Sequence, residues 1–517
     1  MLRWSLLAAK SAVHHGFGWL ASRELETLLL EAALALPRPR HADAPGRGGP
    51  TRWLHVMDKA YLGGGHTSLV LRWLQFDPAS NRHSVVLLSQ PDPVHPLLVE
   101  RVQDSGASLE TFPPDAPLAE RAARLRHLAW TGADRVVLHV HPYSVVPATA
   151  LGVEGGPPVM LLNHLSQKFW VGGSVADLVL NLRESALEWS RAYRGVSRNA
   201  ILPIPISAQG EGRADSVPAE ARRAARHLLG LPLDSTVLLT IGHHYKYRSL
   251  PGIDFLEAAA GILRACPRAH MMAVGPREDS RWAAVREVTG GRVRAVGHQR
   301  DLAPFRLAAD IYLEGFPVGS PTALLEAGLS GIPCIRAPRC VPHPFSADGA
   351  ALGGVRVPVD IPDYVRTAIA LAESPSRRLI EGSALATAIR AHHAPGSWRG
   401  YLHDAEEALP ERHRIYPLRG AAPLPAHVRD FSVALSTVGH AEDTLGFTIQ
   451  AARTLNLRAT MDLPLARALA SQWLFRDREP LRRRRTASTG RESAIGEGLG
   501  YGLRRAKRRI ARMISRG

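Results

Sequence analysis

Cysteine is almost absent from this chain of 517 residues, which has only Cys266, Cys334 and Cys340. None of the three stands in a CxxC pair or in a Cys/His spacing that holds a metal, so the sequence predicts neither a disulfide framework nor a zinc site. This scarcity is typical of proteins in a reducing compartment, and it favours a cytoplasmic location.

Long apolar runs are also missing. No stretch of about 18 apolar residues occurs, so no membrane-spanning helix is expected. Residues 1–36 place apolar side chains at helical spacing, but the charged sequence RELE at 23–26 interrupts the apolar core that a signal peptide needs. We therefore expect an amphipathic helix in this segment, either packed on the protein or lying on a surface.

Lysine is scarce. Only five of the 64 basic residues are lysine, and the rest are arginine. This bias is typical of a GC-rich bacterial genome. The net charge of +17 still favours anionic partners, and it concentrates at 482–485 and 503–513. We expect the C-terminus to lie on an anionic membrane surface, or else to be a frayed basic tail. No aromatic-basic RNA motif occurs, so no nucleic acid is expected as a partner.

Short apolar runs alternate with helical stretches, the pattern of a parallel sheet with helices on both faces. The predicted strands of the first half lie at 52–58, 84–89, 135–140, 158–163 and 177–182. Those of the second half lie at 236–242, 269–275, 292–297, 310–315 and 332–337. The sequence therefore predicts an α/β fold with two consecutive Rossmann-like halves.

Composition and pattern divide the chain into four parts. They are an N-terminal helical segment and linker at 1–50, a first Rossmann-like domain at 51–206, a second at 207–409, and a basic, partly flexible C-terminal extension at 410–517. The linker is the Pro/Gly/Arg-rich stretch at 37–50, and the crossover between the two domains is placed near LPIPIS at 202–207.

The segment at 310–335 carries the clearest chemical signal. After a predicted strand, Ser320 suits the N-cap of a helix and Pro321 its first turn. The unpaired amides at such a helix start attract a phosphate, and Thr322 adds a hydroxyl. Glu326 lies four residues later on the same face, where its carboxylate can accept the two hydroxyl protons of a ribose. The alternative is a well-capped structural helix with a solvated glutamate.

A polar loop at 240–252 closes the first strand of the second half and carries Lys246 and Arg248. Ligands of parallel sheets gather at the carboxyl ends of strands, where this loop lies. A lysine there supplies a point charge for a diphosphate leaving group. The alternative is an ordinary surface lysine. That alternative is the weaker one, because the chain uses arginine at almost all of its basic positions.

These two segments resemble the donor half of GT-B glycosyltransferases, above all the O-linked N-acetylglucosamine transferase family and its bacterial protein-glucosyltransferase relatives. The matching positions are Glu314, Phe316, Pro317, Gly319, Thr322 and Glu326, together with the Tyr-Lys pair at 245–246. The resemblance covers about 150 residues of the second half. It implies two facing Rossmann-like domains and transfer of a hexose or N-acetylhexosamine from a nucleotide diphosphate sugar to an acceptor hydroxyl.

Roles for single residues follow from the same resemblance. It implies Lys246 on the diphosphate, Thr322 and its neighbouring amides on the phosphates, and Glu326 on the ribose. The loop at 295–301 would frame the nucleotide base, with His298 and Arg300 as the nearest candidates. Glu314, Gly319 and Ser320 complete the predicted donor set.

The chain departs from the family in two places. The family's common His-Thr-Thr at the helix start reads Pro-Thr-Ala at 321–323, and no tetratricopeptide array is present. The large retaining family of bacterial glycosyltransferases is a more distant likeness, because its second glutamate lies eight positions after the first instead of the twelve found here. This spacing favours an inverting reaction.

The first half supplies candidates for the acceptor side. Gly63, Gly64 and Gly65 form a flexible loop between a strand and a helix, which allows close approach of the backbone to a ligand. An inverting transfer needs a base to take the proton of the acceptor hydroxyl. His164 is the first candidate because histidine titrates near neutral pH, and His66 and Asp177 follow. Substrate contact by His139 and His141, at a strand end, is an alternative.

No DxD motif stands at a strand end, so we expect no divalent metal and no cofactor beyond the nucleotide sugar. UDP-GlcNAc, UDP-glucose and GDP-sugars are the expected donors, and a glycan, a lipid-linked glycan or a protein is the expected acceptor. Retaining transfer, epimerisation of the donor and a non-catalytic nucleotide-sugar-binding scaffold are the alternatives. We expect the protein in the cytoplasm, with the basic terminus holding it peripherally on the inner face of the plasma membrane.

Overall fold

The computed structural model describes residues 1–15, 18–39, 50–61, 65–77, 80–91, 93–206 and 219–437. The described residues all belong to one compact unit. Most of the predicted linker at 37–50 and both basic stretches, at 482–485 and 503–513, lie outside the described residues.

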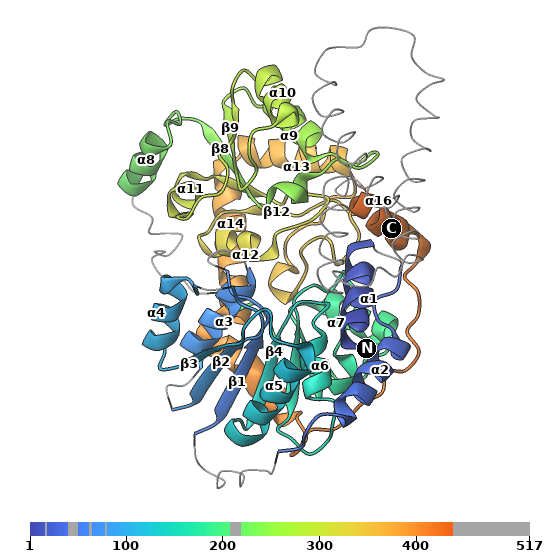
Figure 1. Ribbon diagram of the computed structural model, residues 1–517. Coiled ribbons are helices and arrows are strands. Elements are labelled where there is room, and N and C mark those ends of the chain that lie inside the picture. The colour runs from blue at the N-terminus through green and yellow to red at the C-terminus, as the bar shows by residue number, and fades with distance from the viewer. Residues whose placement is uncertain are drawn as a thin grey trace, which may run out of the picture. The chain divides into compact units, whose positions relative to one another are not determined.

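The first sheet has seven parallel strands in the order β3-β2-β1-β4-β5-β6-β7 (Figure 1). They are β1 (Arg52–Met57), β2 (Arg82–Leu87), β3 (Ser108–Thr111), β4 (Arg135–His139), β5 (Val159–Asn163), β6 (Leu178–Asn181) and β7 (Asn199–Ile201). The five predicted strands of this half are confirmed. The prediction missed β3 and β7 because these strands, which form the two edges of the sheet, are short and lack the run of apolar residues that marks the others.

The second sheet has five parallel strands in the order β10-β9-β8-β11-β12. They are β8 (Thr236–Ile241), β9 (Ala269–Val274), β10 (Val293–Ala295), β11 (Ile311–Leu313) and β12 (Cys334–Ile335). All five predicted strands are confirmed. In both sheets the strand order reverses beside the first strand, which creates the crevice at the carboxyl ends where open α/β sheets bind ligands.

Helices fill the connections of both sheets. Those of the first are α3 (Gly65–Phe76), α4 (Pro96–Asp104), α5 (Leu118–Gly132), α6 (Val145–Ala150) and α7 (Glu184–Arg194). Those of the second are α8 (Ala219–Leu228), α9 (Phe255–Ala265), α10 (Ser280–Val288), α11 (Ala303–Ala308) and α12 (Pro321–Leu329). The helices that follow are α13 (Ile361–Glu373), α14 (Pro375–His393), α15 (Pro395–Glu407) and α16 (Ala426–Thr437).

The N-terminal segment forms two helices where a single one was expected, α1 (Leu2–His15) and α2 (Arg23–Leu34). Gly18, with a φ of 81°, lies between them in the left-handed region that favours glycine. Ser22 then caps α2, because its side chain accepts a hydrogen bond from the Leu25 amide.

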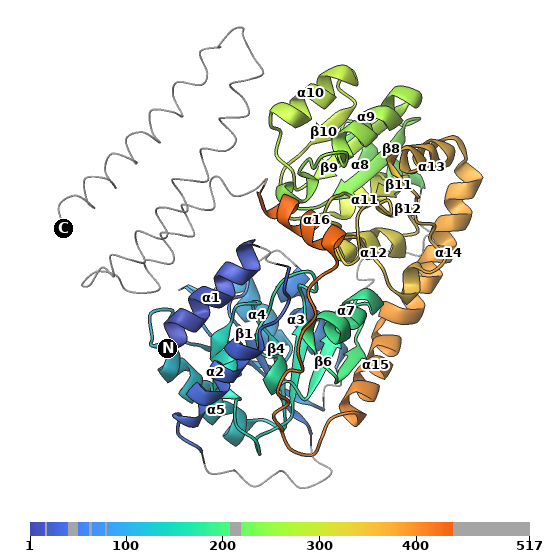
Figure 2. The same ribbon diagram turned by 90° about the vertical axis from the view of Figure 1, so that its right-hand side faces the viewer.

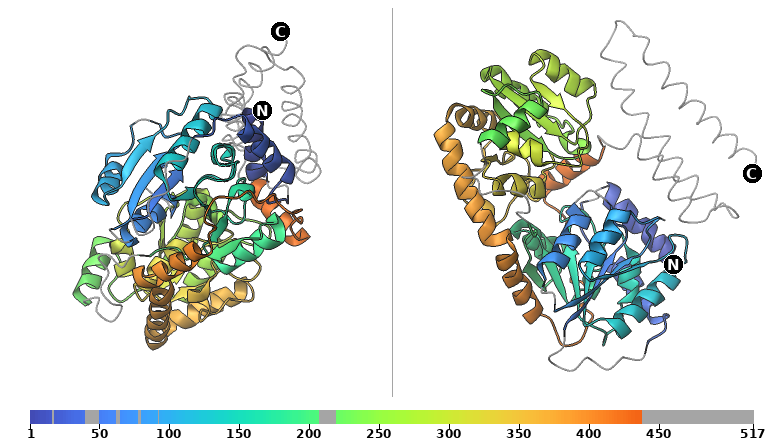
Figure 3. Two further views of the ribbon diagram at one scale, coloured as in Figure 1. Left: turned by 90° about the horizontal axis from the view of Figure 1, so that it is seen from below. Right: turned by 90° about the vertical axis from the view of Figure 1, so that its left-hand side faces the viewer.

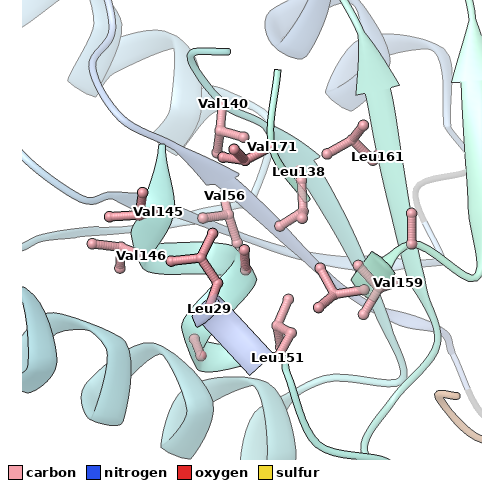
Figure 4. Packing of buried hydrophobic residues seen from close by; sticks show 14 of the residues in the cluster. Leu29, Val56, Leu138, Val140, Val145, Val146, Leu151, Val159, Leu161 and Val171 are labelled. Carbon is pink, nitrogen blue, oxygen red and sulfur yellow. The ribbon is translucent and has the colours of Figure 1, made fainter. Parts of the chain in front are cut away.

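The helix α2 buries its apolar side against the first sheet. Figure 4 shows Leu29 of α2 close to Val56 of β1 and to Val146 of α6, all of them buried. A continuous core of this kind explains why the central strands read as unbroken apolar runs in the sequence.

The helices α14 and α15 run one after the other along the side of the molecule, from the second sheet to the first (Figures 2 and 3). Trp398 of α15 is fully buried in the core of the first sheet, where its indole donates to the Pro203 carbonyl at 2.9 Å. The predicted second half, at 207–409, therefore ends in a helix that packs against the first sheet.

Candidate functional site

A cavity of about 440 Å³ lies at the carboxyl ends of both sheets. The loops and helix starts that follow β1, β4, β5 and β6 line one side, and those that follow β8 and β11 line the other. Both sheets therefore direct their carboxyl edges, where open α/β sheets bind ligands, into one cavity.

The start of α12 forms the wall on the side of the second sheet, with Gly319, Ser320 and Thr322 in the lining. Ser320 occupies the N-cap position with Pro321 after it, as predicted, but its hydroxyl makes no capping hydrogen bond to the helix. The Lys246 ammonium instead donates to Ser320 Oγ at 3.0 Å and to the Gly319 carbonyl at 2.8 Å. The lysine is therefore held directly beside the first amides of the helix.

Burial lowers the pKa of Lys246 to about 8, while the nearby Glu314 carboxylate acts in the opposite direction. At neutral pH the side chain still carries its charge. A helix N-terminus and an ammonium group side by side form a site suited to an anion.

Glu314 supports this wall from behind and does not line the cavity. Its buried carboxylate accepts hydrogen bonds from the amides of Ala337, at 2.8 Å, and Ala347, at 2.6 Å. A Cβ added to Gly319 would lie 2.2 Å from Glu314 Oε1, so only glycine fits there. The acid and the glycine of the sequence pattern thus shape the loop that precedes α12.

The wall on the side of the first sheet contains two histidines, His66 at the start of α3 and His164 after β5. Their ring centroids are 3.8 Å apart, and the Nε2 atom of each is buried without a hydrogen-bond partner. Burial lowers the pKa of His66 to about 4 and that of His164 well below its ordinary value. Both rings are therefore neutral at pH 7, but neither titrates near neutral pH as the sequence led us to expect of His164, because burial opposes the charged form.

The glycine-rich loop is only partly described, because Gly63 and Gly64 lie outside the described residues. Gly65 lines the cavity, and a Cβ added to it would lie 3.6 Å from the hydroxyl of Thr322. The start of α3 therefore faces the start of α12. The close approach of this loop to a ligand stays a prediction.

Arg183 is a cavity residue that sequence reasoning missed. Its guanidinium donates to the carbonyls of Pro344 at 2.6 Å and Ser346 at 2.8 Å, and to Ser166 Oγ at 3.1 Å. Asp348 lies 3.4 Å away, and burial lowers the pKa of Arg183. Its place in the sequence could have identified it. It lies two residues after the buried strand β6, and ligands of parallel sheets gather at the carboxyl ends of strands.

Asp177 does not reach the cavity, contrary to its place among the candidate bases. It precedes β6 and therefore lies at the amino end of the sheet, whereas the cavity lies at the carboxyl end. Its fully buried carboxylate accepts from the amides of Val159 and Arg414, at 2.7 and 2.9 Å, and lies 2.7 Å from His413 Nδ1. These contacts fasten the segment after α15 to the first sheet.

Glu326 is also outside the cavity lining. Its carboxylate accepts from Arg72 of α3 at 2.5 Å, and Arg306 of α11 lies 3.6 Å from it. This face of α12 is therefore engaged with α3 and α11 in the structure.

The other predicted donor residues are not in the lining either. Arg248 follows the turn that carries Lys246, and His298 and Arg300 are exposed in the loop after β10. His139 is buried outside the lining, whereas His141 lines the cavity. Among the described residues no group of three or more His, Cys, Asp or Glu side chains is arranged to hold a metal ion. No helix in the described part combines the length and apolar character that crossing a membrane requires.

No family model and no curated protein sequence matches this chain. Solved structures do. An O-GlcNAc transferase mutant from Thermobaculum terrenum is 16% identical with a TM-score of 0.50, and the match covers 85% of this chain and 79% of that one. A glycosyltransferase from Rickettsia africae is 11% identical with a TM-score of 0.52, over 69% and 98% of the two chains. HepE from Anabaena, in complex with UDP and glucose, is 13% identical with a TM-score of 0.50, over 69% and 100%.

These likenesses, together with the two parallel sheets and their shared cavity, establish the fold. The chain has the GT-B fold of glycosyltransferases, as the sequence predicted. At these identities the likeness extends to the fold alone.

Proposed function

We propose that the protein is a glycosyltransferase that moves a hexose or N-acetylhexosamine from a nucleotide diphosphate sugar to an acceptor hydroxyl. The observation that carries this proposal is the position of Lys246 at the start of α12, across one cavity from His66 and His164. One wall thus offers positive charge to a leaving group, and the other offers proton acceptors.

The donor diphosphate would lie against the start of α12. Lys246 and the first amides of the helix would balance the charge that develops as the sugar leaves, with the Thr322 hydroxyl beside them. Compensation by an ammonium and by helix amides needs no divalent metal. HepE was determined with UDP and with UDP-glucose, which supports a UDP-sugar, such as UDP-glucose or UDP-GlcNAc, ahead of a GDP-sugar.

The acceptor would enter on the side of the first sheet. His164 or His66 takes the proton of its hydroxyl as the oxygen attacks the anomeric carbon, because both rings are neutral and present an unpartnered Nε2. We propose inversion at that carbon, which the twelve-residue spacing of Glu314 and Glu326 favours. Contact of Glu326 with the ribose, and of His298 and Arg300 with the base, remains part of the proposal.

The test is a transfer assay with purified protein, UDP-, GDP-, dTDP- and ADP-sugars, and acceptors of the glycan, lipid-linked and protein classes. We expect transfer from one donor type, with a product of inverted configuration by NMR and with no loss of rate in EDTA. If neither hydrolysis nor transfer occurs for any donor–acceptor pair while the nucleotide sugar still binds, the result would favour a non-catalytic binding scaffold. A product of retained configuration would replace inversion by the retaining reaction, and conversion of the free donor without acceptor would identify an epimerase.

The cellular setting is the cytoplasm, with the basic C-terminus at an anionic membrane surface and a bacterial surface glycan as the product. Removal of residues 480–517 would test this by vesicle sedimentation. We expect the parent chain to sediment with phosphatidylglycerol vesicles and the shortened chain to stay in the supernatant. Equal sedimentation of the two chains would contradict the membrane role of the terminus.

A further inference from the structure

A buried lysine of the N-terminal helix α1 lies close to the segment that follows β4. Lys10 stands between Ala9 and Val13, two residues of α1 that belong to the apolar core of the first sheet. Only 9% of the lysine is exposed, and its ammonium lies 5.3 Å from the centroid of the Tyr143 ring. Within the described residues this ammonium has no hydrogen bond and no ion pair. The lysine is therefore buried, yet the fold gives its charge no direct partner.

The carboxylate of Asp58 acts on Lys10 but does not pair with it. Burial lowers the pKa of Lys10, and so does the charge of Lys59, whereas Asp58 raises it. Both oxygens of Asp58 are already engaged, one with the His141 amide and the other with the Ser144 hydroxyl, each at 2.7 Å. A buried cation with unused hydrogen-bond donors costs free energy. We expect such a residue where a ligand supplies the missing acceptor.

Lys59 and Tyr143 add two further unused donors. Lys59 is half-buried, and in the part of the chain that the structure describes its ammonium also lacks a hydrogen bond and an ion pair. The Tyr143 hydroxyl has no hydrogen-bond partner among the same residues. Burial, together with Asp58, raises the pKa of Tyr143 to about 12, so the hydroxyl keeps its proton and can donate at neutral pH. Two ammonium groups beside one carboxylate leave an excess of positive charge here, which attracts an anion.

His141 connects this group of donors with the cavity. Its ring lines the cavity, and the ring centroid lies 5.3 Å from that of Tyr143 and 6.1 Å from that of His66. Neither His141 nor Tyr143 is fully buried. The donors therefore lie one ring behind the wall that carries the candidate bases, on the side of the cavity that belongs to the first sheet.

We propose that Lys10, Lys59 and Tyr143 bind an acidic group of the acceptor, a carboxylate or a phosphate, and that the protein glycosylates an acidic saccharide. The inference rests on the proposed function, because it places the accepting hydroxyl beside His66 or His164. The acidic group then lies past the rings of His141 and Tyr143, where it accepts the hydrogen bonds that the fold leaves unmade. Hydrogen bonds between an ammonium and an anionic oxygen are the strong, charge-assisted kind.

The proposal also gives the helix α1 a role at the reaction site. This helix precedes the first strand of the sheet and packs against α6, the helix that begins two residues after Tyr143. Its apolar residues Ala9 and Val13 hold it there and thereby fix the position of Lys10.

The scarcity of lysine makes the site readable by NMR. The chain has five lysines, so lysine labelled with carbon-13 at Cε and nitrogen-15 at Nζ gives few signals, and Lys10→Met and Lys59→Met assign the two that matter. The probes are methyl glucoside, methyl glucuronide and methyl glucoside 6-phosphate. They differ at a single carbon, which carries a neutral hydroxymethyl group, a carboxylate or a phosphate ester.

We expect the signals of Lys10 and Lys59 to shift with an acidic sugar and not with the neutral one, and the sugar that acts identifies carboxylate or phosphate as the group bound. Signals of both lysines that move with neither acidic sugar would overturn the subsite. A shift confined to Lys246 would place the acidic group at the start of α12 and overturn it as well.

The transfer assay separates this inference from the proposed function. The control variant is Arg3→Met, which removes one positive charge from the exposed side of the same helix. We expect kcat/KM for an acidic acceptor to exceed that for its neutral counterpart by about tenfold or more in the parent and in Arg3→Met, and this ratio to fall towards one in Lys10→Met.

Equal use of acidic and neutral acceptors by the parent would overturn the subsite and leave the transfer reaction intact. If the labelled lysines respond to an acidic sugar but no acceptor is glycosylated, the proposed function fails while the binding of the acidic group stands.

The melting temperature of Lys10→Met distinguishes ligand binding from a structural role. Methionine is unbranched like lysine and fits a buried place without a charge. We expect this variant to melt at or above the temperature of the parent, because it removes a buried cation that the fold does not pair. A fall in melting temperature larger than that of Arg3→Met would assign the charge to the packing of α1 and contradict the inference.

Discussion

The Lys246 ammonium donates to Ser320 Oγ at 3.0 Å, in the position where a helix-capping serine would ordinarily accept from its own helix. Lys246, in the loop after β8, thus reaches Ser320 at the N-cap of α12. The charge of the lysine lies beside the unpaired amides of that helix. This arrangement makes the start of α12 an anion site with two independent sources of attraction.

The pKa of Lys246 predicts how donor binding depends on pH. Burial lowers this pKa to about 8, so the side chain is charged below that pH and neutral above it. A diphosphate prefers the charged form, and we therefore expect the donor Kd to stay constant up to about pH 7 and to rise as the pH passes through about 8. Calorimetry across this range tests the prediction. A flat profile in the parent, or the same slope in Lys246→Ala, would contradict it.

Replacement of the cavity histidines separates chemistry from binding. We expect His164→Gln or His66→Gln to lower kcat by about 100-fold or more, because a lost general base costs that much, with little change in donor Kd. The variant with the greater loss identifies the base. Initial rates at saturating donor and acceptor give kcat, and calorimetry gives Kd. Full turnover in both variants would remove the histidines from the mechanism.

The pairing of Glu326 with Arg72 allows two roles of the glutamate to be distinguished. If Glu326 moves to the ribose when the donor binds, Glu326→Gln should weaken binding of a ribonucleotide more than that of the 2′-deoxy analogue. If it serves only to hold α3 against α12, Glu326→Gln and Arg72→Gln should have equal effects on both ligands. We expect the first result. Equal losses for both nucleotides in both variants would assign Glu326 to the contact between helices.

Glu26 of α2 tests a contribution to stability from a residue that takes no part in the proposed reaction. Its buried carboxylate accepts from the amides of Gly172, Gly173 and Ser174, at 2.6, 3.2 and 3.1 Å, in the loop just after the cavity residue Trp170. Glu26→Ala leaves these donors unsatisfied, so we expect the free energy of unfolding to fall by about 3 kcal/mol. Denaturant titration measures it, with the exposed Glu31→Ala as the control. A loss no larger than that of the control would contradict the anchoring role.

Much of the fold could be predicted because the central strands are continuous apolar runs. Strands such as β4 and β5 are buried on both faces, and this constraint is visible in the sequence itself. The edge strands β3 and β7 pack on fewer neighbours and tolerate polar residues, so no comparable pattern marked them. The break between α1 and α2 contains Gly18 in a left-handed conformation, which periodicity does not reveal.

The cavity was partly predictable from strand ends. Lys246, Thr322, His66 and His164 all follow strands or begin helices, and the parallel topology brings such positions to one edge. Asp177 does not follow a strand. The strand β6 begins after it, so its side chain lies at the amino edge of the sheet, opposite the cavity.

The contacts of three buried histidine rings, between His83 and His55 at 3.0 Å and between His55 and His139 at 3.1 Å, were not predictable, because they depend on register. His55, His83 and His139 are separated by 28 and 84 residues along the chain, and a shift of one residue in either strand pairing would turn a ring to the other face. Only the observed pairing of β1 with β2 and β4 aligns the three rings.

The most direct test of the account is the affinity of Lys246→Ala for its nucleotide sugar, measured by calorimetry near pH 7 beside the parent and beside Arg264→Ala. Arg264 is exposed near the end of α9, outside the cavity, and serves as a control for the loss of one positive charge. We expect the lysine variant to bind about 10- to 100-fold more weakly, the range of a charge-assisted hydrogen bond, and the arginine variant to bind like the parent. Equal affinity in all three proteins would contradict the assignment of the start of α12 as the diphosphate site.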